Sequence, residues 1–486
     1  MKVKFSTRFI VAVLVIFTIL SFIPNEAFAA TQYKDIEVNK SYTAELTKED
    51  KQYYFSFRAP ADGYFTVNVA KKDVSTSAKY KLAIKNADGS VTYQSLNGAS
   101  VTSTSYGTKS GVKYYLAVSN DNSAALKTQF TIKVNFKNSD KWDNEPNNNQ
   151  ATAKVIAPST NYYGIISDND DGDFFAVTAP SAGYFNFSLK HNDVSASGRF
   201  NMSVLDVNGN VIYQGSGKKI STIKYGVKPN TKLYIKIKNY DGGKFKVYKL
   251  NALFTADNYY EQESNATAAA ATKIDFDKEY KGVIGNWASD DADFYKFSTP
   301  RLSKVTLTFG PADVSKVGKW NVYLVSQKGK QVKLVDFKES TQTVTFNVGK
   351  GNFYLKVTNG TSAKNKEYKL KLTRRDITMK SKKPTIISSS VTGYKKNSTS
   401  RYFKGLSLQS RIPGAEAYQV KVSTKASMKN PILTIKLKGN KKLLTKTPMS
   451  SSSKVFYVQC RPYVTDAFGT VIYGKMSNVK KVVAKK

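Results

Sequence analysis

The chain has 486 residues, with 75 Lys or Arg against 36 Asp or Glu and a formal net charge of +39. Its single cysteine, Cys460, excludes an internal disulfide, and its single histidine, His191, excludes a multi-histidine zinc site and the HExxH motif. No GxSxG, P-loop or GxGxxG motif occurs. The sequence therefore predicts a protein that is not an enzyme.

The N-terminus has the pattern of a secretory signal peptide. Basic residues within 2–8 precede an apolar run over 9–23, and Ala-Phe-Ala at 27–29 supplies small residues for cleavage. A membrane anchor is the alternative, but the run is shorter than the ~20 apolar residues of a spanning helix. We expect a signal peptide over 1–29, a mature chain without a transmembrane segment, and a secreted or loosely wall-associated protein.

One segment recurs three times with a period of 120 residues. Its copies are RAPADGYFTVNVAKKDVS (58–75), TAPSAGYFNFSLKHNDVS (178–195) and STPRLSKVTLTFGPADVS (298–315). Solenoid repeats usually span about 20–50 residues, so this period indicates whole domains in tandem. Apolar and polar residues alternate within each copy, between turn pairs such as Asn208-Gly209, which is typical of antiparallel β-sandwiches.

We therefore expect an all-β chain of tandem antiparallel β-sandwiches. Repeat one is predicted over 30–140, repeat two over 141–257, repeat three over 258–376, and a fourth, basic domain over 384–486. The alanine-rich stretch at 266–272 is too short for a stable helix on its own.

The two chemically distinctive side chains both have structural interpretations. A Ser–His–Asp triad would have to use His191, but this residue comes directly before Asn192-Asp193, and we expect a solvent-facing loop histidine. Cys460 lies in the alternating stretch KVFYVQCRPYV, where we expect a small buried residue in a strand.

Oxygen-bearing side chains concentrate at the start of repeat two. DNEPNNNQATA (143–153) is followed by SDNDDGDFFAVTAP (167–180). This pair resembles the signature of the bacterial pre-peptidase C-terminal domain family, which includes the collagen-binding domains of clostridial collagenases. In that family an acidic E-x-E-P-N-N linker precedes the sandwich, and a D-x-x-D-[FWY] segment starts a core strand. All three repeats match its strand pattern, which implies three jelly-roll sandwiches.

The resemblance also implies calcium between the linker and the strand entry, where it rigidifies the linker. Carried over residue by residue, the ligands in repeat two are Asp143, Glu145, Asn147, Asn148, Asp170 and Asp173. Those in repeat three are Glu261, Glu263, Asn265, Asp290 and Asp293, with Ser264 in place of the proline and Ala266 in place of the second Asn. Calcium takes roughly six to eight oxygen ligands. The alternative is a polar turn built from Asn, Asp and Pro.

Repeat one departs from this pattern. Asp50 corresponds to Asp170, but Tyr53 stands where Asp173 would be, and residues 31–43 contain no E-x-E-P-N. We therefore expect Ca²⁺ in repeats two and three and none at this position in repeat one.

The last quarter of the chain is different in sequence and strongly basic. SRIPGAEAYQVKVSTK (410–425) and residues 454–482 resemble strands of the fibronectin type III-like modules of secreted Gram-positive proteins, which implies an Ig-like sandwich. Residues 377–486 contain 23 Lys or Arg against two acids, a net charge of +21. Such a field attracts polyanions and weakens with salt. The alternative is that the charge serves solubility alone.

These observations predict a secreted, non-catalytic binding or adhesion protein with calcium-stiffened linkers. The expected partners are a collagen-like extracellular protein or an anionic cell-wall polymer or polysaccharide, with no specific nucleic acid. Exposed tyrosines among the 31 of the chain suit collagen or glycan binding, although core packing explains most of them equally well. One alternative is an accessory or chaperone subunit of a separately encoded secreted protease, and another is a hydrolase with an unrecognised site.

Overall fold

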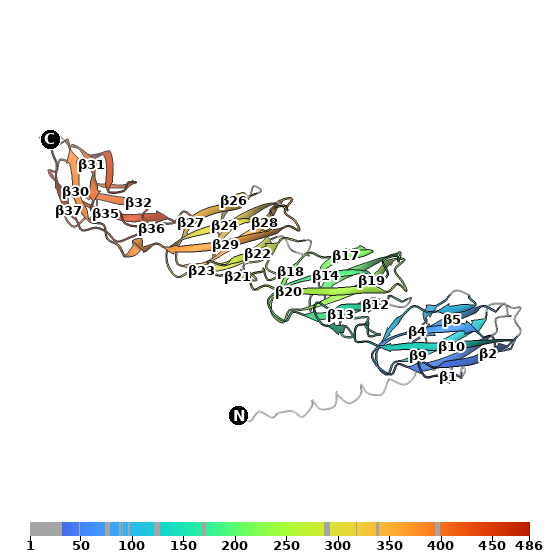
Figure 1. Ribbon diagram of the computed structural model, residues 1–486. Helices are drawn as coiled ribbons and strands as arrows, with labels where there is room; N and C mark the ends of the chain where they lie inside the picture. Colours follow the sequence, from blue (N-terminus) through green and yellow to red (C-terminus); the bar gives the residue numbers. More distant parts are fainter. Residues whose placement is uncertain are drawn as a thin grey trace, which may run out of the picture.

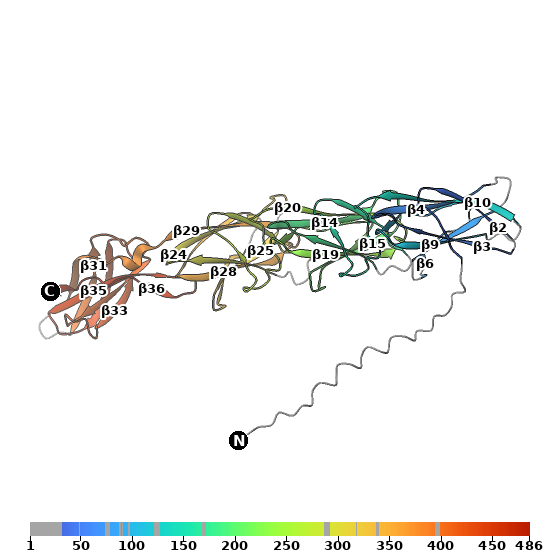
Figure 2. The same cartoon turned by 90° about the horizontal axis from the view of Figure 1, so that it is seen from below.

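The computed structural model describes residues 32–47, 49–72, 78–86, 89, 91–95, 98–120, 127–167, 172–285, 292–316, 318–336, 340–393 and 399–486. Regular structure in these residues is almost all β-strand, with one short 3-10 helix, η1 (Thr378–Ser381). The strands form eight sheets with four large cores, which confirms the expected tandem β-sandwiches. Figure 1 shows the sandwiches in a row in chain order, and Figure 2 shows the same extended arrangement from below.

The first two sandwiches have the same topology. One sheet of the first has the order β1-β3-β9-β5-β6 and the other β2-β10-β4-β7, with β8 paired to β4. The matching sheets of the second are β11-β13-β19-β15-β16 and β12-β20-β14-β17, with β18 paired to β14. The strands of the first are β1 (Lys34–Asp35), β2 (Ser41–Thr47), β3 (Gln52–Arg58), β4 (Gly63–Lys71), β5 (Tyr80–Lys85), β6 (Val91–Gln94), β7 (Ser100–Thr102), β8 (Tyr106–Thr108), β9 (Lys113–Asn120) and β10 (Lys127–Asn138). Those of the second are β11 (Lys154–Ile156), β12 (Asn161–Gly164), β13 (Asp173–Thr178), β14 (Gly183–His191), β15 (Arg199–Leu205), β16 (Val211–Gly217), β17 (Lys219–Ser221), β18 (Tyr225–Val227), β19 (Lys232–Asp241) and β20 (Tyr248–Ala256).

The third sandwich repeats this plan, and the fourth does not. The third has sheets β21-β23-β28-β25-β26 and β22-β29-β24-β27, whereas the fourth has β30-β31-β34 and β33-β32-β35-β36, with β37 paired to β35. The strands of the third are β21 (Thr272–Lys273), β22 (Glu279–Val283), β23 (Ala292–Thr299), β24 (Ser303–Pro311), β25 (Lys319–Ser326), β26 (Gln331–Asp336), β27 (Gln342–Val348), β28 (Gly351–Thr361) and β29 (Glu367–Asp376). Those of the fourth are β30 (Ile386–Thr392), β31 (Ser400–Leu408), β32 (Ala417–Ser423), β33 (Leu433–Leu437), β34 (Lys442–Ser450), β35 (Val455–Thr465), β36 (Val471–Tyr473) and β37 (Lys480–Val483).

The sequence repeat corresponds to one central strand in each of the first three sandwiches. Strands β4, β14 and β24 begin at residues 63, 183 and 303, which keeps the period of 120. Alternate side chains of each strand are buried, because successive residues of a strand point to opposite faces of the sheet. The buried sets are Phe65, Val67 and Val69 in β4, Phe185, Phe187 and Leu189 in β14, and Val305, Leu307 and Phe309 in β24.

The expectation of a solvent-facing loop for His191 was wrong. His191 is the last residue of β14, pairs with Tyr248 across the sheet and is only 4% exposed. It shares the parity of Phe187 and Leu189, so the alternation that buries those residues also turns the imidazole inward. Its Nε2 lies 2.9 Å from the carbonyl oxygen of Gly198, and its ring packs on that of Phe200.

Cys460 lies where it was expected, buried in strand β35. Burial raises the pKa of its thiol to about 12. The thiolate is the reactive form of cysteine, so this side chain is an inert part of the core.

Some predictions concern residues or properties beyond this description. The signal peptide predicted over 1–29 lies outside the described residues. Among those residues, no helix is long and apolar enough to cross a membrane. The four sandwiches follow the order of the predicted domains, whose boundaries stay predictions.

Candidate metal centres at two junctions

The segment that joins the first two sandwiches runs beside strand β12 before it reaches the second core. The backbone N–H of Asp143 donates to the carbonyl of Tyr163, and the N–H of Tyr163 donates to the carbonyl of Lys141, both at 2.8 Å. The ring of Trp142 stacks on that of Tyr64 in the first sandwich at 4.4 Å between centroids. Main-chain hydrogen bonds and this stack therefore fix the position from which the Asp143 side chain extends.

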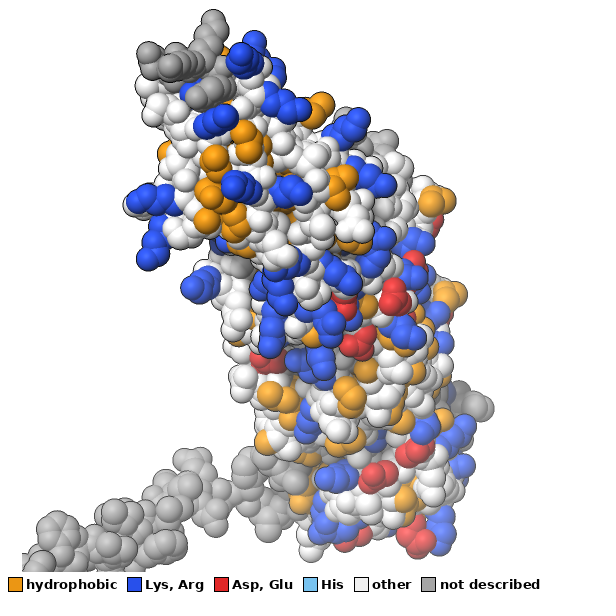
Figure 3. All heavy atoms as spheres, turned by 90° about the vertical axis from the view of Figure 1, so that its left-hand side faces the viewer, with side chains coloured by type: hydrophobic (Ala, Val, Ile, Leu, Met, Phe, Trp, Pro, Cys, Tyr) orange, Lys and Arg blue, Asp and Glu red, His pale blue; other side chains and the backbone are white. Residues whose placement is uncertain are grey.

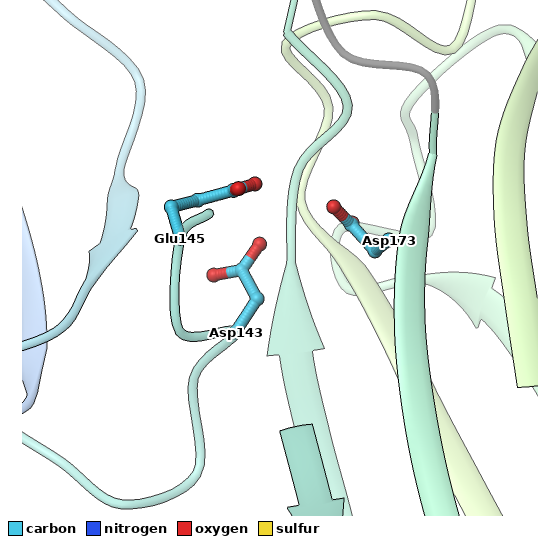
Figure 4. Close-up of side chains that lie close together, drawn as sticks. All are labelled: Asp143, Glu145 and Asp173. Carbon is cyan, nitrogen blue, oxygen red and sulfur yellow. The ribbon is translucent and has the colours of Figure 1, made fainter. Parts of the chain in front are cut away.

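Three carboxylates meet at this first junction. Asp143 and Glu145 come from the linker, and Asp173 is the first residue of β13. One oxygen from each lies within 4.8 Å of the other two. Figure 4 shows the three side chains extending toward a common space between the linker and the strand. Asp143 and Asp173 are fully buried, and Glu145 is half-buried.

Hydrogen bonds orient Asp143 and Asp173 in this first cluster. Oδ2 of Asp143 accepts from the N–H of Ile165 at 3.2 Å, and the hydroxyl of Tyr248 donates to Oδ2 of Asp173. The carbonyl of Asn147 accepts from the N–H of Phe174 at 2.9 Å. The linker is thereby tied to the strand at the residue directly after Asp173.

The amide of Asn147 adjoins the carboxylates. One end of the Asn147 amide lies 3.3 Å from Oε2 of Glu145 and 3.2 Å from Oδ1 of Asp173. With nitrogen at that end the amide donates to both carboxylates, and with oxygen there it adds a further oxygen to the cluster. Oδ1 of Asn148 is buried and accepts no hydrogen bond within the described part of the chain.

Two glycines make room for Asp143, and one of them belongs to the preceding sandwich. A Cβ on Gly107, the middle residue of β8, would lie 1.6 Å from Oδ1 of Asp143. A Cβ on Gly164, at the end of β12, would lie 2.5 Å from Oδ2 of Asp143 and 2.2 Å from the hydroxyl of Tyr248. Any larger residue would overlap these atoms, so the carboxylate occupies a space that only glycine leaves open.

The second junction repeats this construction. One oxygen each from Glu261, Glu263 and Asp293 lies within 4.8 Å of the others. The N–H of Glu261 donates to the carbonyl of Lys281 at 2.9 Å, and Oε1 of Glu261 accepts from the N–H of Val283 at 2.6 Å. These are the counterparts of the bonds that Asp143 makes with Tyr163 and Ile165.

Equivalent glycines, and an equivalent hydrogen bond between linker and strand, occur at the second junction. A Cβ on Gly226, the middle residue of β18, would lie 2.0 Å from the carbonyl oxygen of Glu261, and one on Gly282 would lie 2.5 Å from its Oε2. The carbonyl of Asn265 accepts from the N–H of Phe294 at 2.9 Å. The glycines were missed in the sequence, although Tyr-Gly occurs at equivalent places in both copies, at 106–107 and 225–226.

Two buried tyrosines supply donors to the second cluster. The hydroxyl of Tyr368 donates to Oδ2 of Asp293, and that of Tyr295 donates to Oε2 of Glu261 at 3.2 Å. The two hydroxyl oxygens are 2.7 Å apart. Burial, together with the neighbouring carboxylates, raises the pKa of both tyrosines well above the ordinary value. They therefore remain protonated donors.

A buried amide oxygen at the second junction lacks a donor among the residues that the structure describes. The Asn265 side chain is fully buried, and its Nδ2 donates to Oγ1 of Thr272 at 3.4 Å. Its Oδ1 accepts no hydrogen bond from the described residues. An unmatched buried acceptor costs free energy unless a cation or water satisfies it.

One position distinguishes the two clusters electrostatically. Lys154 pairs with Phe175 in the second sandwich as Thr272 pairs with Tyr295 in the third. The Lys154 ammonium donates to Oδ1 of Asn144 at 2.7 Å. Burial lowers the pKa of Lys154, and nearby carboxylates including Asp143 oppose that shift. The first cluster therefore has a buried cation close by, where the second has a hydroxyl.

The predicted ligands divide into those that the structure places and those outside the described residues. Asp170 and Asp290 lie outside the described residues. The other predicted ligands except Asn148 lie at the two clusters, and their role as ligands stays a prediction. In the first sandwich, Tyr53 in β3 packs its ring against Phe55 and Phe130.

No family model and no curated protein matches the chain. Among solved structures it is similar to the pre-peptidase C-terminal domain of a collagenase from Bacillus anthracis, at 15% identity over 21% of this chain and 94% of that one (TM-score 0.19). It is also similar to a tandem CBM22 domain from Paenibacillus barcinonensis, at 8% identity over 41% of this chain and 82% of that one (TM-score 0.14). The adhesin domain of Epf from Streptococcus pyogenes matches at 12% identity over 39% of this chain and 69% of that one (TM-score 0.16). At identities this low the similarity concerns the fold alone.

Proposed function

We propose that the protein is a secreted, non-catalytic binding or adhesion protein that attaches to an extracellular matrix protein or a cell-envelope polymer. Ca²⁺ stiffens the junctions before its second and third sandwiches. The observation that carries this proposal is the convergence of three carboxylates at each of two successive junctions.

A cation accounts for the composition of the clusters. Burying several carboxylates together is unfavourable through desolvation and mutual repulsion, and a bound ion reverses both effects. The buried oxygens of Asn148 and Asn265, which have no donor among the described residues, fit the same interpretation. A cation would also select the orientation of the Asn147 amide that turns its oxygen toward the carboxylates.

The donor set suits calcium among the common cations. Every candidate ligand is a carboxylate or amide oxygen, whereas zinc and copper sites usually include His or Cys. Calcium accepts roughly six to eight oxygens in flexible geometry, while magnesium demands near-octahedral geometry and keeps several waters. Asp143, Glu145, Asp173, Asn147 and Asn148 together offer more oxygens than magnesium usually takes from a protein.

The position of the clusters gives the cation a mechanical role. Asp143 and Glu261 each contact a glycine of the preceding sandwich, Gly107 or Gly226, while their hydrogen bonds go to the following one. An ion that fastens the linker to the strand entry would therefore fix the angle between neighbours. A stiff row of sandwiches holds the basic fourth sandwich at a set distance from the first.

The calcium proposal is tested with the purified protein and a double variant, Asp173→Asn with Asp293→Asn. Calcium should raise the melting temperature of the wild type, because an ion at 100 times its Kd stabilises the folded state by about 2.7 kcal/mol per site. X-ray scattering should show a more extended, less flexible chain with calcium than with a chelator. The double variant should lose both responses.

A matched control separates this effect from general charge. Asp241→Asn with Asp336→Asn removes the same charge from two exposed side chains. This control should respond to calcium as the wild type does. A double variant at Asp173 and Asp293 that kept the full response would contradict the proposal.

Attachment is tested on purified cell walls. Retention of the protein should weaken as salt rises, because exposed charges are screened beyond about 10 Å at 0.1 M. Absence of retention on walls and on collagen would overturn the attachment proposal while leaving the calcium sites untouched.

A further inference from the structure

One outer sheet face of the fourth sandwich carries four cations. It belongs to the sheet β33-β32-β35-β36 with β37. Its side chains alternate with the buried Val420, Val422, Val458 and Cys460, so they point away from the core. The strand register places them in three rows, Lys436–Gln419–Arg461, Thr434–Lys421–Gln459 and Tyr457–Lys481. We call this set the basic face.

Arg461 is held in a fixed orientation at the end of the first row. Its guanidinium lies 3.6 Å from the ring centroid of Tyr473. Its Nε donates to Oε1 of Gln419 at 2.8 Å, and Nε2 of Gln419 donates to the Tyr473 hydroxyl at 3.4 Å. The two terminal nitrogens form no hydrogen bond with the described residues, so a planar pair of donors stands ready at the surface.

The two acids of this sandwich accept hydrogen bonds from its own backbone. Residues 377–486 contain only Glu416 and Asp466. Glu416 accepts from the N–H of Thr465, and Asp466 from the N–H groups of Phe468 and Thr470. None of the four cations of the basic face forms an ion pair within the described part of the chain. Figure 3 views the molecule from this end and shows Lys and Arg over the sandwich at the top, with most acidic side chains lower down.

We propose that the basic face is the docking surface for a phosphodiester polymer, with Arg461 as its anchor and Lys421, Lys436 and Lys481 on neighbouring phosphates. This rests on the proposed attachment to a cell-envelope polymer and assigns it a site and a ligand chemistry.

The geometry of Arg461 supports recognition of phosphate. A guanidinium presents parallel N–H donors that match two oxygens of a phosphate or carboxylate, whereas an ammonium acts as a point charge. The Tyr473 ring and the Gln419 amide have already fixed the side chain, so little further conformational entropy is lost on binding. Arg461 therefore supplies geometry, and the lysines supply long-range attraction.

Two tyrosines beside the basic face, Tyr473 and Tyr463, favour a charged backbone over a neutral sugar ring as the feature that is recognised. The guanidinium of Arg461 covers one face of Tyr473, and the ammonium of Lys436 lies 5.1 Å from the ring centroid of Tyr463, which is 6% exposed. These rings serve as supports for cations. Rings that support cations favour a phosphodiester chain over a polysaccharide that stacks on bare aromatic rings.

The test compares two triple variants of the purified protein with the same change in charge. The face variant is Lys421→Gln, Lys436→Gln and Arg461→Gln. The control is Lys404→Gln, Lys442→Gln and Lys446→Gln, on the sheet that lies across the core. Binding is measured by calorimetry against synthetic poly(glycerol phosphate) and against polygalacturonate of matched length, at several salt concentrations.

The face variant should bind poly(glycerol phosphate) at least about tenfold more weakly than the control. Its slope of log affinity against log salt should be shallower by about 2, since three lost phosphate contacts contribute roughly 0.7 each. Equal losses in both triple variants would overturn the site. Tighter binding of polygalacturonate by the wild type would overturn the choice of phosphate.

A conservative variant isolates the role of the fixed guanidinium. Arg461→Lys keeps the charge and should still lose affinity for poly(glycerol phosphate), with the melting temperature as a check on folding. Full affinity in this variant would contradict the anchoring role. If cell walls retain the wild type and both triple variants equally, attachment stands and the basic face is wrong. If walls do not retain the wild type, the attachment itself fails.

Discussion

The last junction of the molecule is built differently from the two before it. Between the third and fourth sandwiches, a loop of the fourth sandwich contacts the base of the third. The N–H of Ala467 donates to the carbonyl of Asn347 at 2.9 Å, and Nδ2 of Asn347 donates to the carbonyl of Thr465 at 3.2 Å. The ring of Phe468 stacks on Phe353 at 6.2 Å between centroids. Direct hydrogen bonds and ring stacking join the sandwiches at this junction, whereas an acidic cluster lies at each of the other two.

The strand register shows that the two kinds of junction differ at one equivalent position of the three sandwiches. Gly107, Gly226 and Asn347 pair with residues 64, 184 and 304, which are separated by the repeat period. Where the residue is glycine, an acid of the linker occupies the space beside it. Where it is asparagine, the side chain itself holds the neighbouring sandwich. One edge of a repeated fold can thus join its neighbour in two ways, and only one involves a candidate cation site.

Gly226→Val should break this comparison most strongly. Its Cβ would overlap the carbonyl of Glu261 at 2.0 Å, so the linker has to move. We expect a loss of about 1–3 kcal/mol in the free energy of unfolding, the range for overpacking, and loss of the calcium response at the second junction. Thermal unfolding with calcium and with a chelator measures both.

Gly349→Ala serves as a control at a glycine with open space, because a Cβ there comes only within 3.9 Å of Ile472 at the last junction. It should change neither stability nor the calcium response. A valine at 226 that left the calcium response intact would show that contact with the preceding sandwich is irrelevant to the cluster.

Phe468→Ala should sharpen the comparison at the last junction. The change removes the aromatic pair with Phe353, worth about 0.5–1.5 kcal/mol beyond burial. X-ray scattering should show greater flexibility at this end of the molecule to the same extent with calcium and with a chelator. Restoration of stiffness by calcium would contradict the division between the two kinds of junction.

Lys154→Thr should produce the smallest effect and distinguish the two acidic clusters. The substitution gives the first cluster the residue that the second has at this place, and removes a buried cation that would compete with a bound ion for Asp143. We expect calcium affinity at the first cluster to rise by less than about tenfold, which corresponds to 1.4 kcal/mol. Calorimetric titration of the variant and of the reverse change, Thr272→Lys, measures the shift, and opposite signs are required.

Local patterns in the sequence were sufficient to predict much of the fold. The period of 120 and the two-residue alternation in segments such as 63–71 and 183–191 identify the central strands, because both features reflect which face is buried. The carboxylates of linker and strand entry were found through the resemblance to the pre-peptidase C-terminal domain signature, and Asp173 and Asp293 also keep the period of 120.

Contacts between distant segments could not be read in this way. Tyr248 and Tyr368 donate to the clusters across 75 residues of chain, which depends on strand register. Gly107 meets Asp143 only because two sandwiches dock in one orientation. His191 was predicted in a loop because polar residues, Asn192 and Asp193, follow it. Strand β14 in fact continues through His191.

Trp142 links the first junction to an optical signal. The chain has three tryptophans, and the structure describes two of them, Trp142 and Trp320. Trp320 is enclosed in the third core, whereas the indole of Trp142 lies between Tyr64 and Tyr163, one residue before Asp143. Changes in the relative tilt of the first two sandwiches will therefore alter its fluorescence emission, so the unlabelled molecule contains its own gauge of hinge motion at one end.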